Sequence, residues 1–323
     1  MAAANVAPLS VAPMMDWTDR HCRYFHRQLN QQARLYTEMV TTGAVIHGDR
    51  EHLLSFDPAE HPVALQLGGS EPEDLARAGK IGAGYGYDEI NLNVGCPSER
   101  VQKGSFGACL MKEPELVRDC MQALGEAVDV PVTVKTRIGV DEFDSAAFLE
   151  DFVATVAESG VTMFVIHARK AWLKGLSPKQ NREIPPLAYE RVHFLRQRFP
   201  NLKFVLNGGL TEVEQSLAEL EHVDGIMLGR TAYQDPWILV ELGHRLGQNV
   251  ATSRSAVIER MADYAAAHMA RGGRLQHVAR HMLGLFHAQP GAKRWRQMLS
   301  QNMHRPGIGP ELFYQACPER AAA

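Results

Sequence analysis

The sequence predicts a (β/α)8 barrel, the TIM-barrel architecture, followed by a small all-helical domain. The first observation is that eight short β-rich runs alternate with amphipathic stretches over about 240 residues, the size and strand count of such a barrel. The second is that 323 residues leave room for a smaller domain beside the barrel. The third is that residues 255–302 contain no β-branched run and carry their apolar side chains at helical spacing.

The expected strands and helices follow one another regularly along the first part of the chain. Strands are expected at 9–13, 34–40, 62–67, 88–94, 131–136, 162–167, 203–207 and 224–228. Between them lie helical patterns such as 114–128, 145–159 and 211–220, which begin with Pro, Ser and Thr, respectively. A doubly wound open sheet is the competing topology, and it is disfavoured because no glycine fingerprint follows the first strand.

The last part of the chain is expected to form helices broken by glycine and proline. Gly272-Gly273 and Pro290-Gly291 interrupt a region in which Met282, Leu285 and Phe286 fall at helical spacing. We therefore expect a catalytic barrel over residues 1–245 and a helical domain over residues 246–323. The residues after Pro318 are expected to fray.

Charge and cysteine usage indicate the kind of partner and the compartment. From Arg254 onward there are ten Lys/Arg and four Asp/Glu, whereas the whole chain has 34 and 37, so residues 1–253 hold 24 and 33. A basic tail on an acidic body suggests contact with a polyanion, although a solvated helical surface would look the same. Five cysteines without paired spacing predict reduced thiols and a cytoplasmic protein. No signal peptide or membrane span is expected.

Polar or glycine-rich residues end nearly every expected strand. In such barrels the carboxyl ends of the strands carry the chemistry, so these residues together predict one active site. In strand order they are Pro13-Met14-Met15, Glu38, Gln66, Asn93 with Cys96, Lys135 with Arg137, His167 with Arg169, Asn207-Gly208-Gly209, and Gly229-Arg230.

The ends of the last two strands predict a phosphate site. Gly208-Gly209 and Gly229-Arg230 can offer backbone N–H groups and one guanidinium where such barrels bind phosphate. With Lys135 and His167 nearby, the phosphate compound we expect is FMN, because a cation stabilises the charge of reduced flavin. Gln66 can bond the flavin rim as donor and acceptor. A structural salt bridge of Lys135 and a core position for His167 are the alternatives.

Cys96 stands in a Gly/Pro-rich loop directly after the fourth strand. A thiol with an ordinary pKa of about 8.5 is mostly protonated at neutral pH, so it can donate a proton or act as a nucleophile. A small buried cysteine without chemistry is equally consistent with the local sequence.

Motifs spread over nearly the whole chain resemble those of the tRNA-dihydrouridine synthases. The stretch from Lys170 to Pro186 is similar to the A subfamily, which acts on uridines 20 and 20a of the tRNA D-loop. The family motifs are carried by Ala12–Asp19, Gln66–Gly69, Asn91–Ser98, Val134–Gly139, His167–Lys170, Asn207–Gly209 and Gly229-Arg230.

The resemblance implies FMN as cofactor, NADPH as reductant and tRNA as substrate. It implies that hydride from reduced FMN goes to carbon 6 of uracil and that Cys96 donates the proton to carbon 5. It also implies that Asn93 contacts the base. Further tRNA contacts are expected from Arg100, Arg182, Lys293, Arg294 and Arg296, whereas Trp295 either stacks on RNA or packs in the core.

Other interpretations of the sequence remain open. One is an FMN oxidoreductase of a free pyrimidine, which would not need a basic helical tail. Another is a non-catalytic RNA-binding barrel, which would not need the full set of Gln66, Cys96, Lys135, His167 and Arg230. The His277-x-x-x-His281 pair is expected to face the surface or RNA, and no metal site is expected. We expect a monomer without membrane contact.

Overall fold

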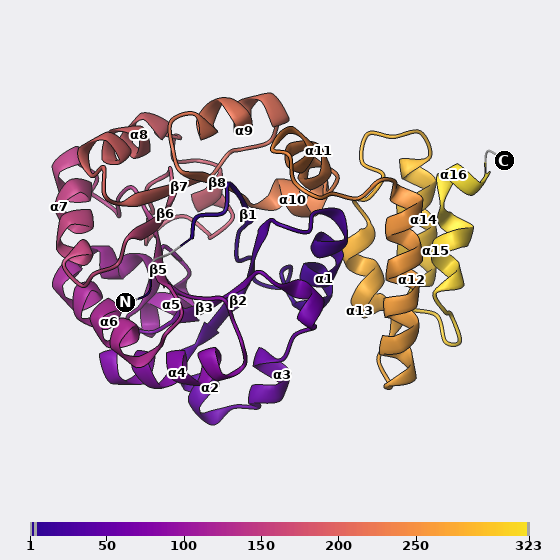
Figure 1. Ribbon diagram of the computed structural model, residues 1–323, viewed down its shortest axis with the longest axis horizontal. Helices are drawn as coiled ribbons and strands as arrows, with labels where there is room; N and C mark the ends of the chain where they lie inside the picture. The colour runs from indigo at the N-terminus through magenta and orange to yellow at the C-terminus, as the bar shows by residue number, and fades with distance from the viewer. Residues whose placement is uncertain (1, 3–4, 322–323) are drawn as a thin grey trace.

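A computed structural model describes residue 2 and residues 5–321, apart from the side chains of residues 100, 103, 320 and 321. Eight parallel strands form a closed barrel, each paired with its neighbour in sequence, and the last pairs with the first (Figure 1). All eight predicted strands are confirmed. They are β1 Leu9–Val11, β2 Arg34–Thr41, β3 Val63–Gly68, β4 Glu89–Val94, β5 Val132–Arg137, β6 Met163–His167, β7 Lys203–Asn207 and β8 Gly225–Leu228.

Helices surround the barrel on the outside (Figure 1). The three helices expected from sequence are present as α6, α7 and α9. In chain order the helices of this part are α1 Arg20–Leu29, α2 Thr42–His47, α3 Arg50–Leu54, η1 Pro58–Glu60, α4 Pro72–Gly84, α5 Glu99–Lys103, η2 Gly107–Lys112, α6 Pro114–Ala127, α7 Ala146–Ala157, η3 Gln180–Arg182, α8 Tyr189–Arg198, α9 Val213–Leu220, α10 Arg230–Gln234 and α11 Ile238–Arg245.

Alternate side chains of each strand enter two different cores. Outward residues such as Leu65 and Ile90 are fully buried beneath the helices. Gly82 lets α4 approach them, since a Cβ at that position would lie 2.4 Å from Leu65. A second, smaller apolar cluster comprises Ala12, Tyr36, Ala64, Met163, Val165, Val205 and Met227. Burial of both faces explains why apolar residues predominate in most of the strands.

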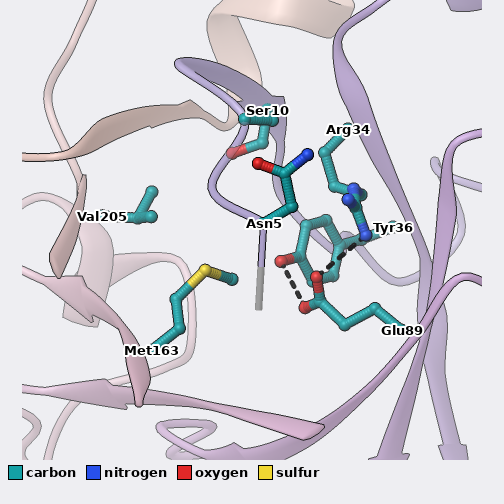
Figure 2. Close-up of a pocket in the computed structure, with 8 residues that line it drawn as sticks. Asn5, Ser10, Arg34, Tyr36, Glu89, Met163 and Val205 are labelled. Atoms are coloured by element: carbon teal, nitrogen blue, oxygen red, sulfur yellow. Dashed lines mark hydrogen bonds and ion pairs between the residues drawn. The ribbon is translucent and has the colours of Figure 1, made fainter. Parts of the chain in front are cut away.

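The amino-terminal end of the barrel is closed by a buried ionic cluster. Glu89 accepts hydrogen bonds from Tyr36 (2.7 Å) and Thr133 (2.5 Å) and pairs with Arg34 (3.1 Å). Figure 2 shows Arg34, Tyr36 and Glu89 beside a small cavity that Ser10, Met163 and Val205 also line. This end is opposite the strand ends that carry the candidate site, so we assign the cluster to barrel structure.

The tail forms helices beside α1, α10 and α11 (Figure 1). The predicted breaks are confirmed, and Gly291 has a φ of 82°, in the left-handed region that favours glycine. Trp295 is a core residue, because its side chain is fully buried and donates to the Met282 carbonyl at 2.8 Å. The expectation of fraying after Pro318 stays a prediction, because α16 runs from Pro318 to Ala321 and residues 322 and 323 lie outside the described residues. The tail elements are α12 Arg254–Ala270, α13 Leu275–Ala279, η4 Arg280–Met282, α14 Ala292–Asn302, α15 Glu311–Ala316 and α16.

The tail is tied to the barrel by polar and aromatic contacts. Asp19, at the start of α1, pairs with Arg280 (2.5 Å) and His281 (3.0 Å) of the tail. Residues 246–253 connect α11 to α12, and the Ala251 N–H donates to the Leu29 carbonyl at 2.9 Å. The proposed boundary at residue 245 stays a prediction. In the described part of the chain, no helix combines the length and apolar character needed to cross a membrane.

Candidate active site

The loop after β4 holds Cys96 in a defined position. The Asn93 side-chain oxygen accepts from the Gly95 N–H (3.1 Å) and the Cys96 N–H (3.0 Å). The Cys96 carbonyl in turn accepts from the Ala108 N–H at 2.9 Å. The thiol is half-buried and lies 3.6 Å from the Ser98 hydroxyl. A partly accessible thiol on a fixed backbone suits a group that must meet a substrate.

A chain of buried hydrogen bonds runs through the barrel to this loop. The Asn93 amide donates to Gln66 Oε1, Gln66 Nε2 donates to Asn91, and Asn91 donates to Thr133, each at 2.8 Å. Thr133 then donates to Glu89 at the amino-terminal end of the barrel. Because buried polar groups that are fully bonded hold a unique geometry, this chain fixes the orientation of Asn93 and therefore the position of the Cys96 loop.

The side-chain amide of Gln66 is already hydrogen-bonded within the protein, so it has fewer groups left to bind a cofactor than its position at a strand end suggests. Its side chain is 1% exposed, and both its oxygen and its nitrogen are engaged in the chain just described. One N–H and one acceptor lone pair remain for another partner. Sequence analysis selected Gln66 and Asn93 but missed Glu89, Asn91 and Thr133, although polar residues at alternate positions of β4 were the available signal.

Lys135 is a half-buried lysine near the carboxyl-terminal end of β5. Its ammonium group donates to Asn207 Oδ1 at 3.0 Å, and Asn207 Nδ2 donates to the Met227 carbonyl at 2.7 Å. Burial, together with the nearby Arg137, lowers the pKa of Lys135 to about 7. Asn207 therefore positions Lys135 in this structure. The expected direct contact of Asn207 with the cofactor stays a prediction.

Arginines gather around His167 at the end of β6. Burial holds the pKa of His167 well below its usual range, with Arg137, Lys135 and Arg169 adding to the effect. Arg137 itself is buried and donates to the Gly95 carbonyl at 2.8 Å and the Asn181 carbonyl at 3.0 Å. It thereby ties the Cys96 loop to the segment after β6. His167 is expected to be neutral within a strongly positive environment.

The ends of β7 and β8 add a glycine-lined edge to this positive region. Gly208 and Gly209 have φ angles of 109° and 69°, which favour glycine, and a Cβ on Gly208 would lie 2.4 Å from the His167 ring. Arg230 forms an ion pair at the surface with Glu183. Gly229 directly precedes α10, which has only five residues. A phosphate site here must therefore rely on side-chain cations and glycine N–H groups more than on a helix dipole.

Arg169 gives the strongest sign that an anion belongs at this edge. Its Nε atom is buried and has no hydrogen-bond partner among the described residues. Arg182 is exposed in η3 and adds a further positive charge near Arg230. An orphaned donor among several cations is the arrangement that a phosphate group satisfies.

The comparisons with known proteins settle the family. The family model described as dihydrouridine synthase (Dus) matches residues 10–319. This chain belongs to the dihydrouridine synthase family. Its members are flavin-dependent oxidoreductases that reduce uridine to dihydrouridine in tRNA, with FMN as cofactor and NAD(P)H as reductant.

Individual relatives of this dihydrouridine synthase are similar over almost their whole length. A tRNA-dihydrouridine(20/20a) synthase of Vibrio parahaemolyticus is 57% identical over 311 residues, covering 95% of each chain. The protein of the same name from Xanthomonas campestris is 56% identical over 98% of this chain and 94% of its own. The solved structure of an old yellow enzyme homologue from Zymomonas mobilis covers 75% of this chain and 90% of its own, with a TM-score of 0.53 and 12% identity, and supports the fold alone.

The remaining predicted site residues lie in different surroundings. Pro13 and Met14 are half-buried, and Met15 is 56% exposed beside Asp16, which has a φ of 64°. The side chain of Arg100 lies outside the described residues. Lys293, Arg294 and Arg296 are exposed on α14.

The expectation that His281 faces the surface or RNA is wrong. Its side chain is fully buried and is bonded to Asp19 at 3.0 Å and to the Tyr233 hydroxyl at 3.1 Å. The helical spacing of His277 and His281 could not reveal this, because the partners of His281 come from two distant segments of the chain.

The basic side chains and the glycines at the ends of β6, β7 and β8 fit the phosphate of FMN. Arg169, Arg230 and the backbone of Gly208 and Gly209 would hold the phosphate, and Lys135 would face the negative edge of the ring. We expect Arg230→Ala to weaken FMN binding by about 1.5–3 kcal/mol, roughly 10- to 150-fold, because one charge-assisted hydrogen bond is lost. Equilibrium dialysis of the apoprotein against FMN measures this.

A matched control for Arg230→Ala is Arg245→Ala. Arg245 likewise forms an ion pair at the surface, with Glu214 at 2.5 Å, but it lies at the end of α11. FMN affinity should be unchanged in the control. Equal FMN affinity in both variants and the parent would show that Arg230 does not bind the phosphate.

Proposed function

We propose that this dihydrouridine synthase reduces uridines 20 and 20a in the tRNA D-loop. The relatives at 56–57% identity carry the name tRNA-dihydrouridine(20/20a) synthase and match this chain over 95% or more of its length. The observation that carries the proposal is the grouping of side chains at the carboxyl ends of the barrel strands. There the half-buried thiol of Cys96, the half-buried Lys135 and the basic residues expected to bind phosphate lie together.

Cys96 is the proton donor in this proposal. When bound, FMN would supply the hydride for carbon 6 of uracil, with NADPH as the reductant. The thiol of Cys96 delivers the proton to carbon 5 and becomes a thiolate. Lys135, Arg137 and Arg182 all interact electrostatically with Cys96, so the loop that carries the thiol lies among basic side chains.

Asn93 positions this donor and meets the base. Its side-chain oxygen fixes the Cys96 backbone, and its amide is fixed by Gln66, so its 9% exposed surface faces the mouth in one orientation. Such pre-organisation matters because proton transfer depends on a short, aligned approach of donor and acceptor.

The helical tail supplies tRNA affinity. Its surplus of positive charge includes Lys293, Arg294 and Arg296 on one exposed turn of α14, while Arg182 and Arg100 would meet RNA at the barrel mouth. We further propose a monomer that acts in the cytoplasm and uses NADPH as reductant. Five free cysteines support a reducing compartment.

Site-resolved modification of a defined tRNA tests the proposal. Purified enzyme, NADPH and an unmodified tRNA transcript should yield dihydrouridine at positions 20 and 20a by mass spectrometry of nuclease fragments. Free uridine and uracil should not be reduced at a comparable rate. Dihydrouridine at other positions would refute the site assignment, and reduction of the free base alone would favour a small-molecule oxidoreductase.

Substituting the α14 cations tests the role of the tail. Replacing Lys293, Arg294 and Arg296 with Ala should weaken tRNA binding and reduce the slope of log affinity against log salt by about two to three, since about three fewer counterions are released. Flavin reduction by NADPH should change little. Titrations of labelled tRNA at several salt concentrations measure the slope.

The control for this variant is a double substitution on the barrel. Arg77 and Lys80 are exposed on α4, and replacing both with Ala removes positive charge without touching the tail. If the control weakens tRNA binding as much as the α14 variant, the tail has no special role and net charge alone accounts for the affinity.

A further inference from the structure

Three histidines from three helices meet where the tail joins the barrel. They are His21 of α1, His268 of α12 and His277 of α13, and each is partly buried. One ring nitrogen from each lies within 4.8 Å of the others. Among the described residues, this is the one group of three potential metal ligands so close together.

The spacing of the nitrogens fits a shared metal ion. His268 Nε2 and His277 Nδ1 are 3.1 Å apart, and the rings of His21 and His268 are 4.5 Å apart between centroids. With zinc–nitrogen bonds of about 2.0–2.1 Å in a tetrahedron, neighbouring ligand nitrogens are about 3.3–3.4 Å apart. The His268–His277 pair, now joined by a hydrogen bond, is already near this spacing, and to enclose an ion the rings must bring the third nitrogen, now within 4.8 Å, closer.

The backbone between α12 and α13 is shaped to bring two of these histidines together. Gly272 has a φ of 85°, and a Cβ on Gly273 would lie 2.1 Å from the His268 ring. Glycine at both positions lets the chain turn back tightly, so that His277 lies against His268. The Gly-Gly pair that sequence analysis identified as a helix break thus also serves the histidine cluster.

The outer contacts of the rings favour metal binding. Neutral imidazole is the form that binds a metal. The Tyr264 hydroxyl lies 2.8 Å from His21 Nδ1, which leaves Nε2 of that ring for an ion, and such outer hydrogen bonds orient metal-binding histidines.

We propose that His21, His268 and His277 bind a zinc ion that pins the helical tail to α1 of the barrel. Imidazole ligands suit zinc among the available divalent ions, and water would take the fourth position. Asp19 is not a fourth ligand, because its carboxylate is already bonded to Arg280 and His281. Zinc binding at this junction is independent of the proposed uridine positions, since none of the three histidines belongs to the barrel mouth.

Metal binding by the intact holoenzyme tests the proposal. After removal of metals with a chelator, equilibrium dialysis against zinc chloride and atomic emission should find one tightly held zinc per chain. Cobalt chloride should give the visible absorption bands of tetrahedral cobalt in a difference spectrum, and zinc should displace it. Saturating zinc should raise the melting temperature by about 5 °C or more, because it binds only the folded chain.

Variants separate this site from incidental zinc binding. His268→Ala and His277→Ala should each weaken zinc binding at least about 100-fold and abolish the thermal shift, whereas Tyr264→Phe, which preserves the ligands, should weaken it about 10-fold. His244→Ala removes an exposed histidine of α11 and should bind zinc like the parent. Parent protein without tight zinc, or unchanged binding in Tyr264→Phe and both alanine variants, would overturn the proposal.

Discussion

Replacing Cys96 with Ala is expected to slow the reduction of tRNA by about 10²- to 10⁴-fold, the usual contribution of a positioned general acid. FMN binding and reduction of the flavin by NADPH should stay nearly intact, because neither step uses the Cys96 proton. Rapid mixing of the reduced enzyme with unmodified tRNA measures the step directly through the return of oxidised-flavin absorbance.

Cys109 provides the matched control for Cys96→Ala. It lies in η2 of the same loop region, its thiol is half-buried, and it donates to the Phe106 carbonyl at 3.1 Å. Burial raises the pKa of Cys109, and we expect it to be a structural thiol. The flavin of Cys109→Ala should be reoxidised by tRNA at nearly the parental rate. If tRNA reoxidised the flavin slowly in Cys109→Ala and at the parental rate in Cys96→Ala, Cys109 would be the proton donor.

The barrel and much of its mouth could be predicted because both depend on local sequence. Each strand is a short apolar run between turn signals, and the carboxyl ends of parallel strands meet at one face whatever the details of packing. Gln66, Cys96, Lys135 and His167 could therefore be recognised as strand-end residues from the sequence alone.

The partners of these residues could not be predicted, because they are set by the register between strands. Asn207 lies opposite His167 in the β6–β7 pairing, yet its side chain reaches across to Lys135 of β5. The chain from Glu89 to Asn93 likewise passes through three strands. A sequence without an alignment shows that a position is polar, but it does not show which polar group completes its hydrogen bonds.

At the junction between barrel and tail, side-chain partners are even harder to predict from the sequence. His21 and His277 are separated by 256 positions in the printed sequence, and nothing local to either residue indicates the other. Only the docking of α12 and α13 against α1 brings them together. The spacing of His277 and His281, which sequence analysis weighed as a possible motif, proved uninformative for this reason.

Lys135 should make the stability of the apoprotein depend on pH. Its pKa is about 7 in the folded protein, mainly because of burial, and 10.5 is the ordinary value expected in the unfolded chain. Between these values the unfolded chain binds a proton that the folded protein does not, so raising the pH favours folding. The contribution of Lys135 should rise by up to about 1.4 kcal/mol per pH unit across this window.

Lys135→Met isolates this contribution, because other groups titrate in parent and variant alike. Urea unfolding between pH 7 and pH 10.5 should show the variant to be the more stable protein at pH 7, with the difference shrinking as pH rises. Lys203→Met, at a partly exposed lysine paired with Asp224 at 3.0 Å, should show no such trend. A pH-independent difference for Lys135→Met would mean that the lysine is not held uncharged by burial. The same variant should reduce its flavin about 10²-fold more slowly, since the lysine whose charge burial opposes in the apoprotein is the one placed to stabilise negative charge on the cofactor.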